Sequence, residues 1–176
     1  MEVYFVRHGE TTANLGHRHQ PGRTRLTVRG EEQARTIAKK AASFQPTHLI
    51  TSSQVRAVET ARVIVDTLDV IPQTNESFQE LIRPEHVIGH KHMSFRSMLY
   101  MLRWYLGWGG NGAGETYTNF LTRLQEAKRQ LEAFPGDARV VIISHSIFIN
   151  FFVAHMCRGG RLRPFMALKV FMKVTT

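Results

Sequence analysis

The sequence contains a single cysteine, Cys157, among its 176 residues and no long uninterrupted apolar run. One cysteine excludes an internal disulfide and a cysteine-based metal cluster. A membrane-spanning helix needs roughly 18 or more apolar residues, and no stretch approaches that length. Strand-like residues follow Met1 almost at once, so we expect no targeting segment before the fold. These absences favour a cytoplasmic protein that has no membrane partner.

Acidic residues are fewer than basic ones: the sequence has 14 Asp and Glu and 23 Lys and Arg, which gives a net charge of +9. Such a surplus attracts anions, which include nucleic acid, lipid headgroups and phosphorylated molecules. The positive residues form no long stripe or tail, which weakens nucleic acid as the partner. We therefore expect a phosphorylated partner and no nucleic acid.

Short apolar, β-branched segments alternate with helical patterns along the chain. The expected strands are 2–6, 48–52, an edge strand at 70–72, 140–144 and a final strand at 165–174. The expected helices are 28–43, 53–65, 98–108, 115–134 and 147–156. Alternation of this kind predicts an α/β fold, here a three-layer α/β/α sandwich with a mostly parallel central sheet.

The chain length and a hydrophobic content of 43% allow one well-buried core, so we expect a single domain over 1–176. The helical and strand patterns weaken between 84 and 113. An aromatic-rich segment there is followed by a glycine cluster that is typical of a loop or hinge. We expect this insertion to form a small cap over the site.

Three of the expected strands end in chemically reactive residues. His8 follows the first strand, Ser52 and Arg56 follow the second, and His145 follows the apolar strand 140–144. Ligands of parallel sheets bind at the carboxyl ends of the strands, so these residues are expected to converge. An imidazole that attacks phosphorus, guanidinium groups that neutralise its oxygens and an acid that protonates the leaving oxygen would suffice for phosphoryl transfer. We expect no cofactor.

Five segments carry a recognisable motif pattern. They are RHGETTAN at 7–14, LTVRGEEQA at 26–34, SSQVRAVETA at 52–61, GET at 114–116 and SHS at 144–146. In this order they resemble the signature of the histidine phosphatase superfamily, the phosphoglycerate mutase-like proteins. An RHG tripeptide alone would be weak evidence, whereas five ordered segments over nearly the whole chain are a strong signal.

The resemblance implies a role for each matched residue. His8 would be the nucleophile that becomes phosphohistidine, and Arg7 and Arg56 would clamp the phosphate oxygens. Asn14 would donate a further hydrogen bond to the phosphate. His145 would stabilise the phosphoryl group from the opposite side.

Three other positions follow from the same resemblance. The helix that begins near Ser146 would point backbone N–H groups at the phosphate. Ser146 replaces the glycine that is usual after the second histidine, and its side chain would lie beside the phosphate. Glu10 and Glu59 would orient the arginines and loops rather than donate protons.

The general acid has three candidates. Glu80 lies in the segment FQELIRP, where many members of the superfamily carry their catalytic glutamate, and it aligns best. Glu85 is the second candidate and Glu115 the third. The donor must lie within hydrogen-bond reach of the leaving oxygen.

Several alternatives remain open. A phosphohistidine or phosphoprotein phosphatase fits the same motifs as a hydrolase of small phosphomonoesters, which we favour because of the inserted cap. Mutase activity is less expected, since nothing marks a pocket that retains an intermediate. A non-catalytic phosphate-binding module is the alternative from another class.

Histidines cluster in two loops, without a zinc-ligand pattern, so we expect no metal. These histidines are His17, His19, His86, His90 and His92. The oligomeric state is not predicted.

Overall fold

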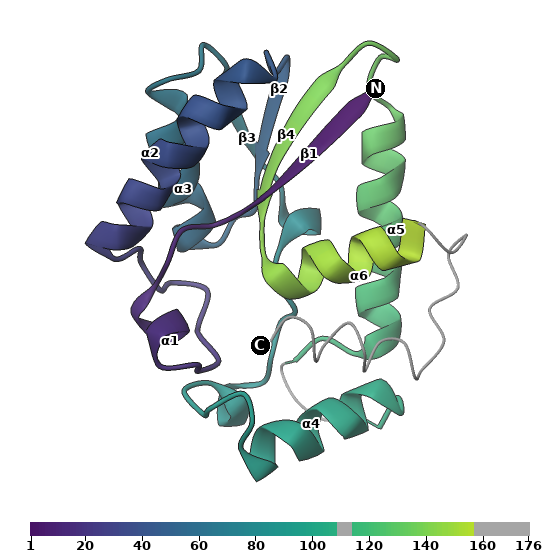
Figure 1. Cartoon of the computed structure of the whole chain (residues 1–176). Helices are drawn as coiled ribbons and strands as arrows, with labels where there is room; N and C mark the ends of the chain where they lie inside the picture. The colour runs from purple at the N-terminus through teal and green to yellow at the C-terminus, as the bar shows by residue number, and fades with distance from the viewer. Residues whose placement is uncertain (109–113, 157–176) are drawn as a thin grey trace.

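A parallel four-stranded sheet forms the centre of the computed structural model, which describes residues 1–108 and 114–156. Its strands are β1 (Glu2–Arg7), β2 (His48–Thr51), β3 (Pro72–Thr74) and β4 (Arg139–Ser144), in the order β1-β4-β2-β3. Helices cover both faces, α2 and α3 on one side and α5 and α6 on the other (Figure 1). The predicted three-layer α/β/α architecture with a parallel sheet is confirmed.

The helices lie close to the expected positions. They are α1 (Thr12–Leu15), α2 (Val28–Ser43), α3 (Val55–Val65), α4 (Phe95–Tyr105), α5 (Tyr117–Glu132) and α6 (Ser146–Met156), with 3-10 turns η1 (Glu76–Phe78) and η2 (Glu85–Val87). The helix expected at 98–108 begins earlier, because the Ser94 hydroxyl accepts a hydrogen bond from the Ser97 N–H and caps it. The short helix α1 was not expected.

The central strand β4 separates two hydrophobic clusters. Val140 and Ile142 pack with α5 and α6, whereas Val141 and Ile143 pack with α2 and α3. This division follows from the two-residue period of a strand, which sends successive side chains to opposite faces. Every residue of β4 from Val140 to Ser144 is buried, as expected for a strand inside a parallel sheet covered on both faces.

The structure corrects one strand and leaves two other predictions untested. The edge strand begins at Pro72 and not at Val70, and proline is tolerated there because it is the first residue of an edge strand. The predicted strand at 165–174 and Cys157 lie outside the described residues. The part of the expected cap that is described, 84–108, consists of η2, a connecting loop and α4.

Helix α4 is packed against the core of the molecule. Tyr100, Met101 and Trp104 are buried in the same cluster as α5 and α6, and the Trp104 indole N–H donates a 2.9 Å hydrogen bond to the carbonyl of Glu115. None of the helices within 1–108 and 114–156 combines the length and the apolar character needed to cross a membrane.

Candidate active site

The carboxyl ends of β1, β4 and β2 lie side by side, as predicted. The last paired residues of β1 and β4 are Arg7 and Ser144. Two backbone hydrogen bonds just beyond the strands hold the residues that follow them in place. The His8 N–H donates to the carbonyl of Ser144 at 3.1 Å, and the Ser52 N–H donates to the carbonyl of Ile143 at 2.9 Å. The sheet therefore places His8, His145 and the start of α3 at one edge.

The His8 imidazole is held in a single tautomer and is uncharged. Its Nδ1 lies 2.7 Å from the carbonyl of Gly9, which can only accept, so Nδ1 carries the proton. The free pair on Nε2 accepts a 3.1 Å hydrogen bond from Nε of Arg56. Burial, followed by the charge of Arg56, lowers the pKa of His8 from 6.5 to about 3. A neutral imidazole with a basic Nε2 is the form that can attack phosphorus.

Arg56 is fixed beneath the pocket on the first turn of α3. It is 1% exposed, and besides His8 it donates to the carbonyl of Pro21 at 3.2 Å and to the side chain of Gln54. Burial lowers the pKa of Arg56 to about 10, which leaves it positively charged at neutral pH. Arg7 is exposed on the pocket wall, and its side chain has no hydrogen-bond partner in the described part of the chain.

Two glycines let the His8 loop lie directly on the start of α2. A methyl group at Gly9 would come within 2.3 Å of the carbonyl oxygen of Gly30, and one at Gly30 within 2.2 Å of the carbonyl oxygen of Glu10. Backbone therefore packs on backbone here, and only glycine fits. The RHG and LTxxG segments of the sequence are the two sides of this contact.

Side chains from two other motifs hold the same loop in place. The Gly9 N–H donates to the Thr60 hydroxyl at 3.1 Å, and the Glu10 N–H donates to Oε1 of Gln33 at 2.8 Å. The Thr27 hydroxyl donates to the Glu10 carboxylate at 3.0 Å and also caps α2. Glu10 thus orients the loop, as predicted from its position.

Asn14 lines the same pocket at the end of its own small turn. Its Oδ1 accepts from the N–H of Thr11 at 3.1 Å and from the Thr11 hydroxyl at 2.9 Å. Because the oxygen is engaged in this capping box, the Nδ2 donor is the group available to a phosphate.

Glu80 lies on the opposite wall and is bound by backbone N–H groups. Its Oε1 accepts from Leu81 at 3.0 Å and from Phe148 at 3.2 Å, and its Oε2 accepts from Ile147 at 3.3 Å. The prediction that the start of α6 points its N–H groups at the phosphate is therefore wrong for Ile147 and Phe148, because the Glu80 carboxylate occupies that helix terminus. Ser146 does line the pocket.

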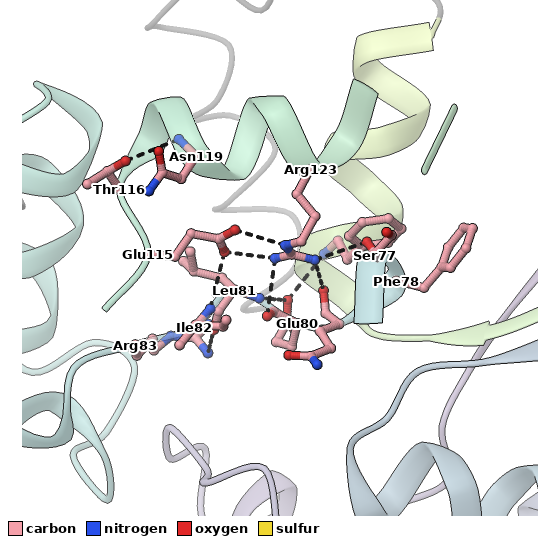
Figure 2. Close-up of polar contacts among 12 residues, drawn as sticks. Ser77, Phe78, Glu80, Leu81, Ile82, Arg83, Glu115, Thr116, Asn119 and Arg123 are labelled. Carbon is pink, nitrogen blue, oxygen red and sulfur yellow. Dashed lines mark hydrogen bonds and ion pairs between the residues drawn. The ribbon is translucent and has the colours of Figure 1, made fainter. Parts of the chain in front are cut away.

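The segment that carries Glu80 is fixed from behind by Arg123 of α5. Figure 2 shows the Arg123 guanidinium between the Glu115 carboxylate and the backbone of 77–80. It donates to the carbonyls of Ser77 at 3.1 Å, Gln79 at 2.7 Å and Glu80 at 3.4 Å. Its distances to Glu115 are 2.8 and 2.7 Å, the two-pronged geometry in which arginine binds a carboxylate well.

This network separates the three candidates for the general acid. Glu115 is paired with Arg123 and its side chain is 7% exposed, and it is not part of the pocket lining. Glu85 is exposed on η2 and is likewise absent from the lining. Glu80 alone of the three faces the pocket that contains His8.

His145 lies behind His8 and not on the pocket surface. It is 0% exposed, its ring centroid is 5.1 Å from that of His8, and its Nε2 shares a 2.8 Å hydrogen bond with the Ser52 hydroxyl. Burial, then the charge of Arg56, holds the pKa of His145 well below its usual value, so the ring is neutral. Direct contact between His145 and a phosphate stays a prediction.

The pocket itself is small, with about 50 Å³ of space accessible to water. Arg18 and His19 line it, although nothing in their pattern distinguishes them from solvated residues. Sequence reasoning missed Gln20, Arg83 and His92, which come from loops with no periodic signal. The full lining is Arg7, His8, Asn14, Arg18, His19, Gln20, Arg56, Glu80, Arg83, His92, Ser146 and Ile147. Within the described ranges, no group of three or more His, Cys, Asp or Glu could hold a metal ion.

Comparison with known proteins agrees with this geometry. The family model of the histidine phosphatase superfamily (branch 1) matches residues 3–170. The chain belongs to this superfamily. The matched histidine, arginine and glycine motifs are the ones that meet at the strand ends.

Curated relatives of this chain include both mutase and phosphatase names. A probable phosphoglycerate mutase GpmB of Enterobacter sp. (strain 638) is 30% identical over 168 residues, which cover 88% of this chain and 74% of the relative. An adenosylcobalamin/alpha-ribazole phosphatase of Salmonella typhimurium is 27% identical over 167 residues, covering 89% and 79%.

Solved structures share the fold. A phosphoserine phosphatase from Entamoeba histolytica superposes with a TM-score of 0.77 at 21% identity and covers 95% of this chain and 83% of its own. A mycobacterial glucosyl-3-phosphoglycerate phosphatase superposes with a TM-score of 0.71 at 23% identity, covering 86% and 79%.

Proposed function

We propose that the protein hydrolyses small phosphomonoesters through a covalent phosphohistidine on His8. The observation that carries the proposal is the state of His8. Its Nδ1 proton is bound by the Gly9 carbonyl, its Nε2 pair lies beside Arg56, and its pKa of about 3 keeps the ring neutral at physiological pH.

The first half of the reaction uses groups on both walls of the pocket. Nε2 of His8 forms a bond to phosphorus while the bond from phosphorus to the leaving oxygen breaks. Arg7, Arg56 and the Asn14 amide bind the phosphoryl oxygens, where charge is concentrated during transfer. Glu80 donates its proton to the leaving oxygen; Oε2 is the oxygen that carries it, since Oε1 already accepts two hydrogen bonds.

The second half returns the enzyme to its starting state. Glu80, now a carboxylate, accepts a proton from water, whose oxygen attacks phosphorus as the bond to Nε2 breaks. Inorganic phosphate leaves, and no metal or redox partner enters the balance. His145 and Ser146 stabilise the transferring group from the α6 side.

Pocket size supports a small substrate, because about 50 Å³ of water-accessible space suits a phosphoryl group with a short leaving group rather than a folded protein surface. One observation favours a second candidate, a phosphoprotein phosphatase. A wider hollow, with about 920 Å³ of water-accessible space, shares Arg7, His8 and Asn14 with the pocket and continues along α2, where an extended segment could lie.

The test is capture of the intermediate. The protein is incubated with ³²P-labelled phosphomonoesters or a phosphohistidine peptide, without added metal, and quenched in alkali, in which a phosphohistidine survives. We expect labelled protein and released phosphate from the wild type and from His86→Ala, an exposed histidine outside the pocket, but neither from His8→Ala. Turnover by the His8→Ala variant would contradict the mechanism. Isomerised 3-phosphoglycerate without net release of phosphate would identify a mutase instead.

A further inference from the structure

Arg83 is a pocket arginine that the proposed chemistry does not use. Its side chain lines the pocket and is half-buried, yet its one hydrogen bond is a 3.4 Å contact from Nη1 to the carbonyl of Leu81. Its Nε is buried without a partner, and Arg83 forms no ion pair with any described residue. A buried N–H without a partner is destabilising, and a half-exposed guanidinium with one long hydrogen bond has donors to spare, so this position favours an anion from solution.

Two polar neighbours of Arg83, His19 and Tyr100, supply no negative charge. His19 is 2% exposed and neither of its ring nitrogens has a partner; burial, then Arg83, lowers the pKa of His19 to about 2. The buried Tyr100 hydroxyl is also unpartnered, and burial raises the pKa of Tyr100 to about 12. Both groups are therefore neutral at physiological pH, and both lie close enough to Arg83 to feel its charge, His19 in the pocket lining and Tyr100 outside it.

The charged residues that line the pocket also favour a second anionic group on the substrate. Four arginines face a single carboxylate, Glu80, which is itself bound to the start of α6. A phosphomonoester brings at most about two negative charges. Arg7 and Arg56 are placed to meet them, which leaves Arg83, with Arg18 at the mouth, facing the rest of the substrate.

We propose that Arg83 forms a subsite for a carboxylate on the leaving group of the substrate, backed by His19 and Tyr100. The inference rests on the proposed function, because the phosphate of the same molecule must lie at His8. A carboxylate matches the single charge and the planar fork of a guanidinium, which binds it through two parallel hydrogen bonds.

The test compares substrates that differ only in this group. Phosphoglycolate is paired with 2-hydroxyethyl phosphate and 3-phosphoglycerate with glycerol 3-phosphate, so that a neutral hydroxymethyl replaces the carboxylate at two chain lengths. For wild type we expect kcat/KM to favour at least one carboxylate by about 10- to 100-fold. Arg83→Gln should remove that preference and change the neutral substrates less than about threefold.

The matched control is Arg96→Gln, an exposed arginine on α4 outside the pocket, which should leave the preference intact. Equal loss on both members of each pair in Arg83→Gln, or no preference in wild type, would overturn the subsite.

Calorimetric binding of the same pairs to His8→Ala, with and without Arg83→Gln, separates this inference from the proposed function. If wild type turns over none of the compounds, the hydrolase proposal fails. The binding ratio then still decides the subsite: a carboxylate preference that depends on Arg83 supports it, and its absence refutes it.

Discussion

The Arg123 guanidinium donates a 2.7 Å hydrogen bond to the carbonyl of Gln79, the residue immediately before Glu80. The same group is paired with Glu115 and lies over the rings of Phe120 and Phe148, with its central carbon 5.1 and 5.6 Å from their centroids. Figure 2 shows the guanidinium with Glu115 on one side and the backbone of the Glu80 segment on the other. Arg123 is thus placed to fix where the Glu80 carboxylate lies.

Arg123→Lys should impair proton donation more than phosphate binding. A lysine keeps the charge, but its three donors cannot replace the five contacts that Arg123 makes with Glu115 and three carbonyls. A shift of about 1 Å in a catalytic group costs up to about 100-fold in rate. We expect kcat for alkyl phosphates to fall roughly 10- to 100-fold, with a smaller loss for p-nitrophenyl phosphate, whose leaving group needs no proton.

The control for this variant is Arg129→Lys, an exposed position on the same helix. In a Glu80→Gln background the Arg123→Lys effect on alkyl phosphates should largely disappear, because two changes that act through one group are not additive. Full additivity would show that Arg123 does not act through Glu80.

Glu80→Gln should produce a larger difference in kcat between alkyl phosphates and p-nitrophenyl phosphate. General acid catalysis is worth about 10²- to 10⁴-fold, so kcat on alkyl phosphates should fall by that order while p-nitrophenyl phosphate changes little. Glu85→Gln is the matched control, since Glu85 lies on the exposed η2 turn. Equal losses on both substrate types, or a larger effect in Glu85→Gln, would remove Glu80 from the role.

Much of the fold was predictable because its signals are local. The apolar run of β4 and the Thr27 cap of α2 each lie within a few residues of the element they define. His8 and His145 follow strand ends directly, and Arg56 lies on the first turn of the helix after β2, so the order of the parallel sheet brings them to one edge.

The remaining site residues depend on contacts between distant segments. Arg123 reaches the Glu80 segment from more than 40 positions away, and nothing on an amphipathic helix distinguishes it from a solvated arginine. The N–H groups of Ile147 and Phe148 were assigned to the phosphate because a helix start attracts any anion. Only the folded chain shows that the Glu80 carboxylate is the anion there.

Gly30→Ala should destabilise the His8 loop. The added methyl would lie 2.2 Å from the Glu10 carbonyl oxygen and 2.9 Å from its nitrogen, so the backbone of the loop or of α2 must move. We expect a loss of about 2–3 kcal/mol in the free energy of unfolding, measured by urea denaturation, with a fall in activity. Gly136→Ala, whose methyl would meet nothing within 4 Å, should change neither quantity; a Gly30→Ala protein as stable as wild type would contradict the close approach.

The buried histidines predict that acid destabilises the protein. Burial, reinforced by Arg56 and Arg83 respectively, lowers the pKa of His8 to about 3 and of His19 to about 2, against 6.5 in the unfolded chain. Between these values and 6.5 the unfolded state binds protons that the folded state does not, so the free energy of unfolding falls as pH falls through this window.

Urea denaturation at about pH 7.5, 6, 5 and 4 measures that slope. His19→Gln removes one of the titrating groups and should flatten the slope relative to wild type, whereas His86→Gln, at an exposed position, should leave it unchanged. A His19→Gln protein that loses stability with acid as steeply as wild type would show that His19 is not buried as a neutral ring beside Arg83.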